Sequence, residues 1–362
     1  MLLSTVLPLA PPQLGWLDQP PEKLHAWLTE RRQPAMRLAQ VQRWLFASRA
    51  SRFEQMTDLP ASLRQELAQS FVPLASTVAR RLTSRDGTEK LLLRLSDGHL
   101  IECVLLKERE RRTVCISTQV GCGMGCVFCA SGLEGVTRNL SRGEILEQLL
   151  HARNLLPAQE RLTHVVVMGM GEPLANLTTL LEALELVCSS KGLAISARHI
   201  HISTVGLPAK MRQLADLGKQ YHLAVSLHAP NDALRNQIVP TNDKIGLQAI
   251  LEAADYFQQT TGRQVTYEYV LLAGINDQPS HARELARLLQ GRQAHVNLIP
   301  FNSVQGLPFR RLSDEALARF VQALQAARIS VKVRKRKGAD IDAACGQLRR
   351  TALGASPPSG DR

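Results

Sequence analysis

Three cysteines lie within eight residues of this sequence, in the segment GCGMGCVFCASG. Cys122, Cys126 and Cys129 have the spacing C-x3-C-x2-C, which is typical of a metal site, and the surrounding glycines let the chain wrap a small inorganic group. Structural zinc takes four closed ligands, and neither Cys115 nor His151 stands at zinc-finger spacing as a fourth. The segment therefore favours a [4Fe–4S] cluster held by three thiolates, with zinc as the alternative.

The composition indicates a basic globular protein. The chain has 362 residues, 44% of them hydrophobic, and a net charge of +12, which suits an anionic partner such as nucleic acid. No stretch approaches the ~20 apolar residues that span a bilayer, so we expect no membrane partner. Seven cysteines with one tight cluster do not indicate a disulfide framework, and thiolate ligands predict a reducing, cytoplasmic location.

The periodicity of the apolar residues divides the chain into five segments. These are a disordered lead, a small helical domain, a β-hairpin extension, an alternating α/β domain and a disordered tail: residues 1–20, 21–75, 76–111, 112–350 and 351–362. Asp58 is a helix-start signal inside the helical domain, and Asp97-Gly98 is a strong hairpin-turn signal. The alternating region predicts a parallel sheet of about six βα units, either an open doubly wound sheet or a partial (β/α) barrel.

Polar or reactive residues follow five of the predicted strands. They are Met170-Gly171-Glu172-Pro173, Ser203-Thr204, His228, Phe301-Asn302 and Cys345. In either architecture ligands bind at the carboxyl ends of the strands, so the pattern predicts one pocket lined from many segments. Cys345 stands between Gly338 and Gly346, as on a mobile loop, although a lone cysteine is also common as a small buried hydrophobe.

The cysteine segment, with Phe128 directly before its third cysteine, resembles the radical S-adenosylmethionine superfamily. The resemblance implies that the cluster's open iron chelates S-adenosylmethionine and that an electron from the cluster splits it into a 5′-deoxyadenosyl radical. It also implies that the turn at Gly171 and Glu172 holds the amino group of the methionine moiety. The alternative is that this turn only links a strand to a helix.

Several further segments resemble one family within that superfamily. They are VCISTQVGCGMGCVFCASG, GMGEPL, HISTVG, SLHAPND, PFN and DIDAACGQL. Their order and spacing are similar to those of the RlmN/Cfr family of ribosomal RNA adenine methyltransferases, over about residues 20–350. MTDLPASLR resembles the accessory domain of that family. The resemblance implies a partial barrel with a helical accessory domain that binds RNA, and two molecules of S-adenosylmethionine per turnover.

The same resemblance assigns roles to individual residues. Cys345 would be methylated first and would then carry the carbon to the substrate. Cys115 would be its resolving partner, and Glu102 would be the proton acceptor. The cluster ligands would be Cys122, Cys126 and Cys129. The S-adenosylmethionine pocket would be lined by Gly171, Glu172, Ser203, Ser226, Leu227, His228 and Asn302.

This use of two extra cysteines follows from the chemistry of adenine. Carbon 2 or carbon 8 has no lone pair that could attack a sulfonium methyl group, so a radical on methylated Cys345 would add to the ring instead. A base then removes the ring proton, and a Cys115 thiolate attacks Cys345, so that the product leaves as a disulfide bond forms. Glu102 lies in a predicted strand, where a charged residue equally often faces solvent.

The substrate expectations rest on charge and on the resemblance. The basic runs KERERR and SVKVRKRKG precede Cys115 and Cys345 and favour a track for an RNA backbone, with the target base extruded into the pocket. Pro173 is typical of the RlmN-like branch, which favours carbon 2 of an adenosine in 23S ribosomal RNA, with tRNA as a second candidate. Gly123 replaces the proline that is usual in the family.

Three alternatives stay open. The first is a Cfr-like methylation at carbon 8 of the same adenosine, and the second is a radical maturase or activating enzyme. The third is a cluster- or zinc-bearing RNA-binding protein without enzymatic activity. Under the first-choice hypothesis we also expect a flavodoxin-type electron donor and a monomeric enzyme.

Overall fold

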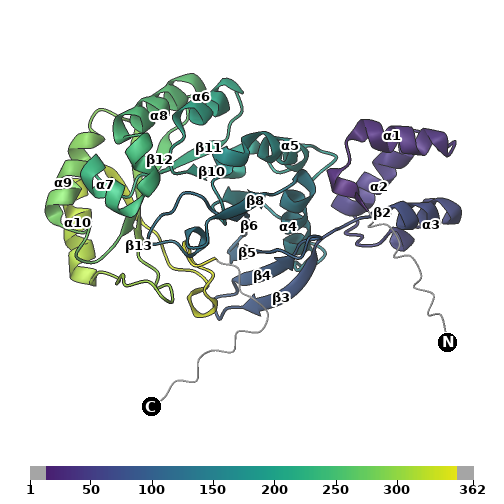
Figure 1. Cartoon of the computed structure of the whole chain (residues 1–362), viewed down its shortest axis with the longest axis horizontal. Helices are drawn as coiled ribbons and strands as arrows, with labels where there is room; N and C mark the ends of the chain where they lie inside the picture. Colours follow the sequence, from purple (N-terminus) through teal and green to yellow (C-terminus); the bar gives the residue numbers. More distant parts are fainter. Residues whose placement is uncertain (1–13, 349–362) are drawn as a thin grey trace, which may run out of the picture. The chain divides into compact units, whose positions relative to one another are not determined.

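The computed structural model describes residues 14–348, which belong to two compact units, Met1–Ala75 and Ser76–Arg362 (Figure 1). The expected tail at 351–362 lies outside the described residues, and so do residues 1–13 of the expected lead. No described helix is long and apolar enough to cross a membrane.

The smaller unit is helical, as its apolar periodicity predicts. Its elements are β1 (Leu14–Gly15), η1 (Trp16–Asp18), α1 (Pro21–Glu30), α2 (Met36–Phe46), η2 (Phe53–Gln55), α3 (Ala61–Ser70) and β2 (Phe71–Val72). Each helix places its leucines on one face, and Leu28, Leu45 and Leu67 are fully buried among them. In α1 and α3 the buried leucines are four residues apart and therefore share one face of the helix, and their burial holds the helices together.

The start of this unit corrects one expectation. Residues 14–20 are not part of a disordered lead, because β1 pairs in parallel with β2 and Trp16 is buried. The Trp16 ring packs edge-on against Phe53 and Phe71, with centroids 6.0 and 5.3 Å apart. A proline-rich composition predicted disorder here, but one large aromatic side chain anchors the segment.

Asp58 does not begin a helix as expected. Helix α3 starts at Ala61 after Pro60, while the Asp58 carboxylate accepts hydrogen bonds from Gln40, Arg43 and Trp44 of α2. The Asp58 side chain therefore accepts hydrogen bonds from α2 and does not cap the start of α3.

The larger unit is built on a single ten-stranded sheet within the described residues. The strand order is β14-β13-β12-β11-β10-β9-β6-β5-β4-β3. Strands β6 and β9 to β14 are parallel, and β3, β4 and β5 continue the sheet with antiparallel pairing. The strands are β3 (Thr77–Thr83), β4 (Glu89–Arg94), β5 (Leu100–Glu108), β6 (Arg111–Cys115), β9 (His164–Val167), β10 (Ile200–Thr204), β11 (His222–Ser226), β12 (Val265–Leu271), β13 (Ala294–Pro300) and β14 (Ser330–Val333).

Helices follow the parallel strands along the chain and lie around the outside of the curved sheet (Figure 1). They are α4 (Arg142–Asn154), α5 (Leu177–Cys188), α6 (Pro208–Asp216), α7 (Asp232–Ile238), α8 (Leu247–Thr261), α9 (Pro279–Leu288) and α10 (Asp314–Ala326). Helix α4 starts at a capping box, in which Ser141 Oγ accepts from the backbone N–H of Glu144 at 3.2 Å. The α/β fold class and the partial barrel are confirmed.

The β-hairpin expected over 76–111 is part of a larger antiparallel arrangement. β4 and β5 pair as the turn at Asp97-Gly98 predicts, and a third strand, β3, pairs with β4. β5 in turn pairs with β6, so these strands extend the barrel sheet and do not form a separate module. β3 reads TVARRLT and is mostly exposed, which hides it from a search for apolar strands.

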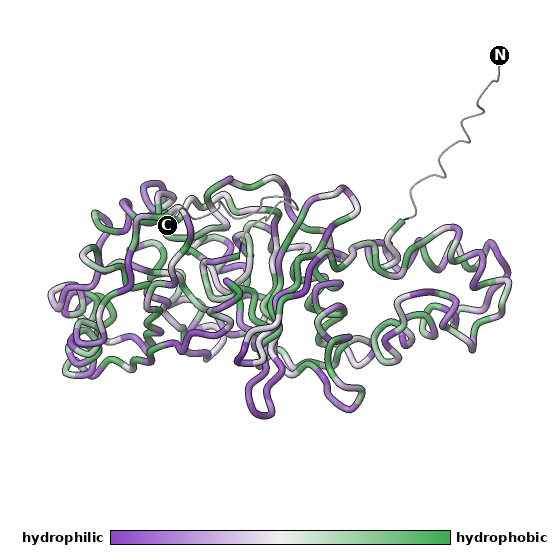
Figure 2. The backbone as a smooth tube through the Cα atoms, turned by 90° about the horizontal axis from the view of Figure 1, so that it is seen from below, coloured by the Kyte–Doolittle hydropathy of each residue, from purple (hydrophilic) through white to green (hydrophobic). Residues whose placement is uncertain are grey.

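Strand residues alternate between the helices and the barrel interior. In β10, Ile200 and Ile202 are fully buried toward the helices, whereas His201 and Ser203 line cavities inside the barrel. Figure 2 shows hydrophobic residues concentrated along the central strands and hydrophilic residues at the projecting turns. The barrel interior is therefore polar enough to serve as a binding site.

Replacing Trp16 with alanine tests whether the segment at 14–18 belongs to the helical unit. Loss of a buried tryptophan leaves a cavity, so we expect the free energy of unfolding of this unit to fall by about 3–5 kcal/mol, measured by thermal melts followed by circular dichroism. Leu14→Ala is the matched control, because the Leu14 side chain is 56% exposed. Equal melting curves for the two variants would contradict the anchoring role of Trp16.

Candidate active site

The cysteine segment forms a loop over the carboxyl ends of the barrel strands. It runs between two short antiparallel strands, β7 (Gln119–Gly121) and β8 (Val136–Asn139), and includes one 3-10 turn, η3 (Ala130–Gly132). Cys122, Cys126 and Cys129 all line a single cavity of about 160 Å³.

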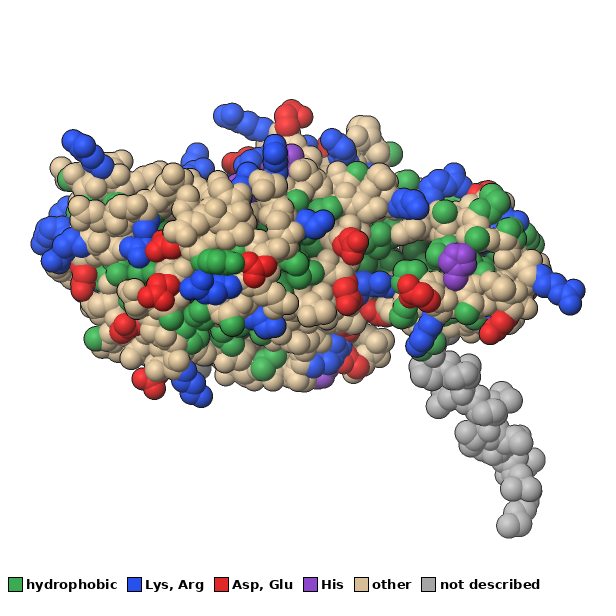
Figure 3. Space-filling model, turned by 90° about the horizontal axis from the view of Figure 1, so that it is seen from above, with side chains coloured by type: hydrophobic (Ala, Val, Ile, Leu, Met, Phe, Trp, Pro, Cys, Tyr) green, Lys and Arg blue, Asp and Glu red, His purple; other side chains and the backbone are tan. Residues whose placement is uncertain are grey.

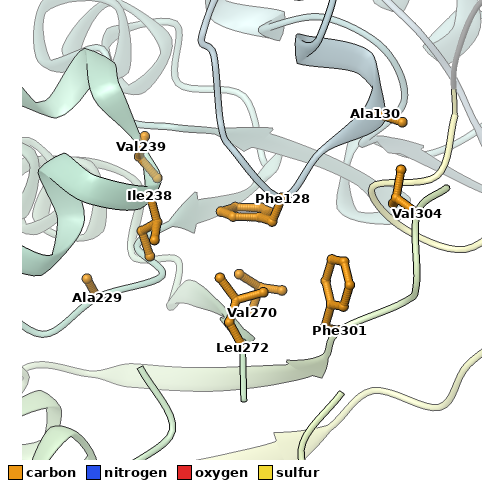
Figure 4. Packing of buried hydrophobic residues seen from close by; sticks show 9 residues of the cluster. All are labelled: Phe128, Ala130, Ala229, Ile238, Val239, Val270, Leu272, Phe301 and Val304. Atoms are coloured by element: carbon orange, nitrogen blue, oxygen red, sulfur yellow. The ribbon is translucent and has the colours of Figure 1, made fainter. Parts of the chain in front are cut away.

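Phe128 anchors this loop in a hydrophobic cluster (Figure 4). Its ring lies among side chains that include Ile238, Val270 and Phe301. The ring also meets His228 edge-on at 4.9 Å between centroids. The aromatic residue before the third cysteine thus fixes the loop onto the barrel, because most of its ring is buried there.

The donor set fits a [4Fe–4S] cluster. Burial raises the pKa of the Cys122 thiol to about 11 and raises those of Cys126 and Cys129 as well, so a nearby cation is what would bring them into the thiolate form. Among the described residues no group of three His, Cys, Asp or Glu side chains is arranged around one metal ion. In a [4Fe–4S] cluster each thiolate binds a different iron, so its ligands need not converge on one point.

Most residues assigned to the S-adenosylmethionine pocket lie around this same cavity. The structure brings together Gly171, Glu172, Ser203, Ser226, His228, Asn302 and Cys345 with the three cluster cysteines. They follow β9, β10, β11, β13 and β14 or end those strands, as the strand pattern predicts. The convergence follows because parallel strands present all their carboxyl ends on one side.

The turn after β9 requires glycine and holds Glu172 rigidly. Gly171 has φ +97°, and a Cβ there would lie 2.6 Å from the Cβ of Gln119. The Glu172 carboxylate is buried and accepts hydrogen bonds from the backbone N–H groups of Leu174 and Val205, each at 2.9 Å. Burial raises the pKa of Glu172, while these two hydrogen bonds act in the opposite direction.

His228 is a neutral donor at the cavity wall. Its backbone has the unusual φ of +61°, and its Nδ1 accepts a hydrogen bond from the Val270 N–H at 3.1 Å. This bond assigns the proton to Nε2. Burial, and then the nearby Arg235, lower the pKa of His228 to about 3, so the ring is uncharged at neutral pH.

Leu227 does not line the cavity, contrary to the expectation. It is fully buried, and its carbonyl accepts a hydrogen bond from Arg235 Nε at 2.9 Å. Arg235, which no sequence pattern indicated, also donates to the carbonyls of Val205 and Ser226. Burial lowers the pKa of this guanidinium to about 10. Nothing in its helix, DALRNQI, distinguishes Arg235 from an exposed helical arginine.

A second, larger cavity of about 580 Å³ adjoins the first inside the barrel. Cys115 lines only this one, whereas Cys345 lines both. All seven cysteines are free thiols, so Cys115 and Cys345 are not joined by a disulfide bond here; the resemblance implies that bond only during product release. Burial raises the pKa of Cys115 to about 12, and the charge of Arg334 acts against that rise.

Arg334 and Glu268 also lie on the wall that the two cavities share. The Glu268 carboxylate accepts two hydrogen bonds from Asn297 Nδ2, at 3.1 and 2.8 Å. The pKa of Arg334 is raised, chiefly by the charge of Cys345 and also by those of Glu268 and Cys115. In the sequence Arg334 is one of several consecutive basic residues. In the structure it directly follows β14, and its side chain lines the barrel interior.

Glu102 lines neither cavity. It is buried in β5, and its Oε1 lies 2.9 Å from Nζ of Lys90 in β4. It is therefore exposed to neither the solvent nor either cavity.

The fold and this site define the class of protein. Residues 116–288 match the model of the radical SAM superfamily, and residues 16–72 match that of the ribosomal RNA large subunit methyltransferase N-terminal domain. A crystal structure of a radical SAM methyltransferase from Sphaerobacter thermophilus is similar over 93% of this chain and 100% of its own, with a TM-score of 0.90 and 42% identity.

Comparison with curated proteins identifies the family. The probable dual-specificity RNA methyltransferase RlmN of Rhodopirellula baltica is 56% identical over 93% of this chain and 90% of its own length. The Bacillus licheniformis protein of the same name is 44% identical over 91% of each chain. This chain belongs to the RlmN family of radical SAM RNA methyltransferases, so an RNA substrate and the two cofactors, a [4Fe–4S] cluster and S-adenosylmethionine, follow.

Exchange of Gly171 for alanine tests the geometry of the turn. Both Gly171→Ala and the control Gly98→Ala place alanine at positive φ, a cost of about 1–2 kcal/mol, but a Cβ at Gly98 meets nothing within 4 Å. At Gly171 the new Cβ displaces Gln119, whose Oε1 accepts from the Glu172 N–H at 2.8 Å. We expect Gly171→Ala to destabilise the larger unit by roughly 1–3 kcal/mol more than the control in thermal melts. Similar melting curves would contradict this.

Proposed function

We propose that this enzyme methylates carbon 2 of an adenosine in 23S ribosomal RNA and in tRNA. The observation that carries the proposal is the position of Cys345 on the wall shared by the cofactor cavity and the larger cavity. A residue there can take up a methyl group on one side and present it to a base on the other. Methylation at carbon 8 is the second candidate, and Pro173 after the Gly-Glu turn favours carbon 2.

Cys122, Cys126 and Cys129 would hold the cluster, and the cavity beside them would hold S-adenosylmethionine. When bound, these two groups supply the methyl group and the radical chemistry that make an adenine ring carbon reactive. Glu172 has free lone pairs beyond its two backbone hydrogen bonds and can accept from an ammonium group. His228 Nε2–H can donate to an acceptor on the ligand. Ser203, Ser226 and Asn302 supply the remaining polar contacts.

Arg334 promotes the thiol chemistry of Cys345 and Cys115. A thiolate is the nucleophile in both methyl capture and disulfide exchange, and burial alone disfavours it at Cys115. The Arg334 guanidinium is within electrostatic range of both thiols, and its charge opposes the effect of burial on the pKa of Cys115. In the release step an S–S bond forms and the S–C bond of Cys345 breaks. The electron pair stays on the carbon, which takes up a proton.

The larger cavity suits an extruded nucleotide and its phosphates. Seven basic side chains line it (Arg111, Arg311, Lys332, Arg334, Lys335, Arg336 and Lys337), against two acidic ones, Glu108 and Glu268. On the face that Figure 3 shows, by contrast, basic and acidic side chains are interspersed. The concentration of positive charge beside Cys115 and Cys345 supports entry of the RNA backbone here.

The remaining assignments follow from the family and the chemistry. The helical unit serves as an accessory RNA-binding domain, and residues 112–348 supply the catalytic barrel. Free thiols and an RNA substrate support a cytoplasmic location. The enzyme acts as a monomer and takes electrons from a flavodoxin-type donor.

Replacement of Cys345 by alanine tests the proposed reaction. The reconstituted enzyme, incubated anaerobically with 23S ribosomal RNA or tRNA, should form 2-methyladenosine, detected by mass spectrometry of the nucleosides. Cys345→Ala should form none, because no residue then carries the carbon, while Cys188→Ala in α5 should keep its turnover. Methylation by Cys345→Ala would contradict the mechanism, and 8-methyladenosine would establish the second candidate.

Neutralisation of Lys332 tests the basic cavity. Lys332→Gln should weaken RNA binding a fewfold at physiological salt and lower the slope of log affinity against log salt by about one, because one phosphate contact is lost. Arg283→Gln, at an exposed position on α9, is the matched control and should change neither. Binding titrations at several salt concentrations would show the difference. An unchanged slope for Lys332→Gln would contradict a contact between Lys332 and an RNA phosphate in the larger cavity.

A further inference from the structure

The segment that carries Cys345 is held by contacts with other parts of the chain. Residues 338–348 contain only one short 3-10 turn, η7 (Ala339–Ile341). Its second half is fixed on the cofactor side, where the Ala130 N–H donates to the Gly346 carbonyl at 2.8 Å. Asn302 Nδ2 donates to the Cys345 carbonyl at 3.2 Å. These contacts hold Cys345 beside the cluster loop.

The first half of the segment docks on the turn between β3 and β4. The Gly338 N–H donates to Asp86 at 3.1 Å, and the Arg85 N–H donates to Asp340 at 3.2 Å. Ser84 Oγ also donates to Asp340. Residues more than 250 positions apart in the sequence therefore meet through hydrogen bonds that involve carboxylates.

Lys90 extends this docking into the sheet. Its Nζ donates to the Asp342 carbonyl at 3.0 Å and lies 2.9 Å from Glu102 Oε1. The side chains of Lys90 and Glu102 are only 8% and 3% exposed. A buried ammonium needs partners for its three hydrogens, and the segment supplies one of them. The ion pair and the segment thus support each other.

Glu102 stands on the face of β5 that turns toward the larger cavity. Val104 and Leu106, two and four residues further along the strand, line that cavity, whereas Glu102 does not. Lys90 lies at this point and contacts both Glu102 and the Asp342 carbonyl. The carboxylate is therefore oriented toward the cavity and closed off from it at the place where the Cys345 segment docks.

We propose that Lys90 is a positioning residue that couples the Cys345 segment to Glu102. While residues 338–343 are docked on the β3–β4 turn, Lys90 holds Glu102 away from the larger cavity, and their release opens Glu102 to the substrate. The role of Glu102 as proton acceptor rests on the proposed function, but the docking does not. Release also gives the free Cys345 thiol the freedom to approach Cys115, which lines the same cavity.

Hydrogen exchange in the full-length enzyme tests the coupling. Lys90→Met keeps the apolar stem of the side chain and removes the ammonium, so backbone amides of 338–343 should exchange at least about tenfold faster. Alkylation of Cys345 by iodoacetamide, measured by peptide mass spectrometry, should also be faster. Lys210→Met is the control, because Lys210 lies at an exposed position on α6 and donates to Gln213 of the same helix, and it should alter neither.

A second variant covers the case in which an unpaired Glu102 disrupts the sheet. Lys90→Met combined with Glu102→Leu removes both buried charges and still lacks the bond to Asp342, so 338–343 should again exchange faster while β4 and β5 stay protected. Unchanged exchange of 338–343 in both variants would overturn the proposal.

Measuring Cys345 methylation and RNA turnover in the same variants distinguishes a failure of the coupling from a failure of the proposed function. Lys90→Met should still become methylated on Cys345, because the cofactor-side contacts remain, but should turn over RNA at least about tenfold more slowly than Lys210→Met, because the segment and Glu102 are then no longer coupled. Equal turnover of the two variants would overturn the coupling to Glu102. If the wild type methylates no RNA, the proposed function fails, and the exchange experiments still decide the docking.

Discussion

The guanidinium of Arg235 is the interaction on which the geometry of the cofactor cavity depends. It is buried and donates to the carbonyls of Val205, Ser226 and Leu227. Those carbonyls belong to the ends of β10 and β11, which present Ser203, Ser226 and His228. A charge in this position is stable only if its acceptors stay in place, so it fixes the two strand ends relative to each other. The part of the cavity wall that these strand ends form is therefore rigid.

The two cavities inside the barrel divide the chemistry between them. The smaller is lined by cluster cysteines and polar strand ends, and the larger by basic side chains and Cys115. Cys345, Glu268 and Arg334 belong to both. The side chain of Cys345 can thus face either cavity without a long displacement of the barrel strands, and Arg334 places a positive charge on the same wall.

Sequence reasoning predicted the parts of the site that depend on strand order. Polar residues after parallel strands must converge, so the positions of Glu172, Ser203 and Asn302 followed from the pattern alone. It could not predict which contacts form across the sequence. Asp58 bonds to α2, Lys90 covers Glu102, and Arg235 turns inward, and each outcome depends on tertiary neighbours that local spacing does not reveal.

The same limit explains the errors in element assignment. Strand β3 has charged residues on a mostly exposed surface, so apolar periodicity did not detect it. Residues 14–18 follow a proline-rich stretch, and their order depends on the aromatic packing of Trp16 against residues far along the chain. Composition describes a segment in isolation, whereas strand β3 and residues 14–18 are ordered by contacts with residues elsewhere in the chain.

The barrel sheet is open, and its two edges are β3 and β14. An open edge exposes unpaired N–H and C=O groups, to which a strand of another molecule can add. Arg80 and Arg81 stand on the first edge strand, and Lys332 stands on the second, just before a run of further basic residues. Charge on both edges makes addition of a second sheet repulsive. Lys332, which lines the larger basic cavity, therefore also disfavours edge-to-edge pairing of two copies of this protein.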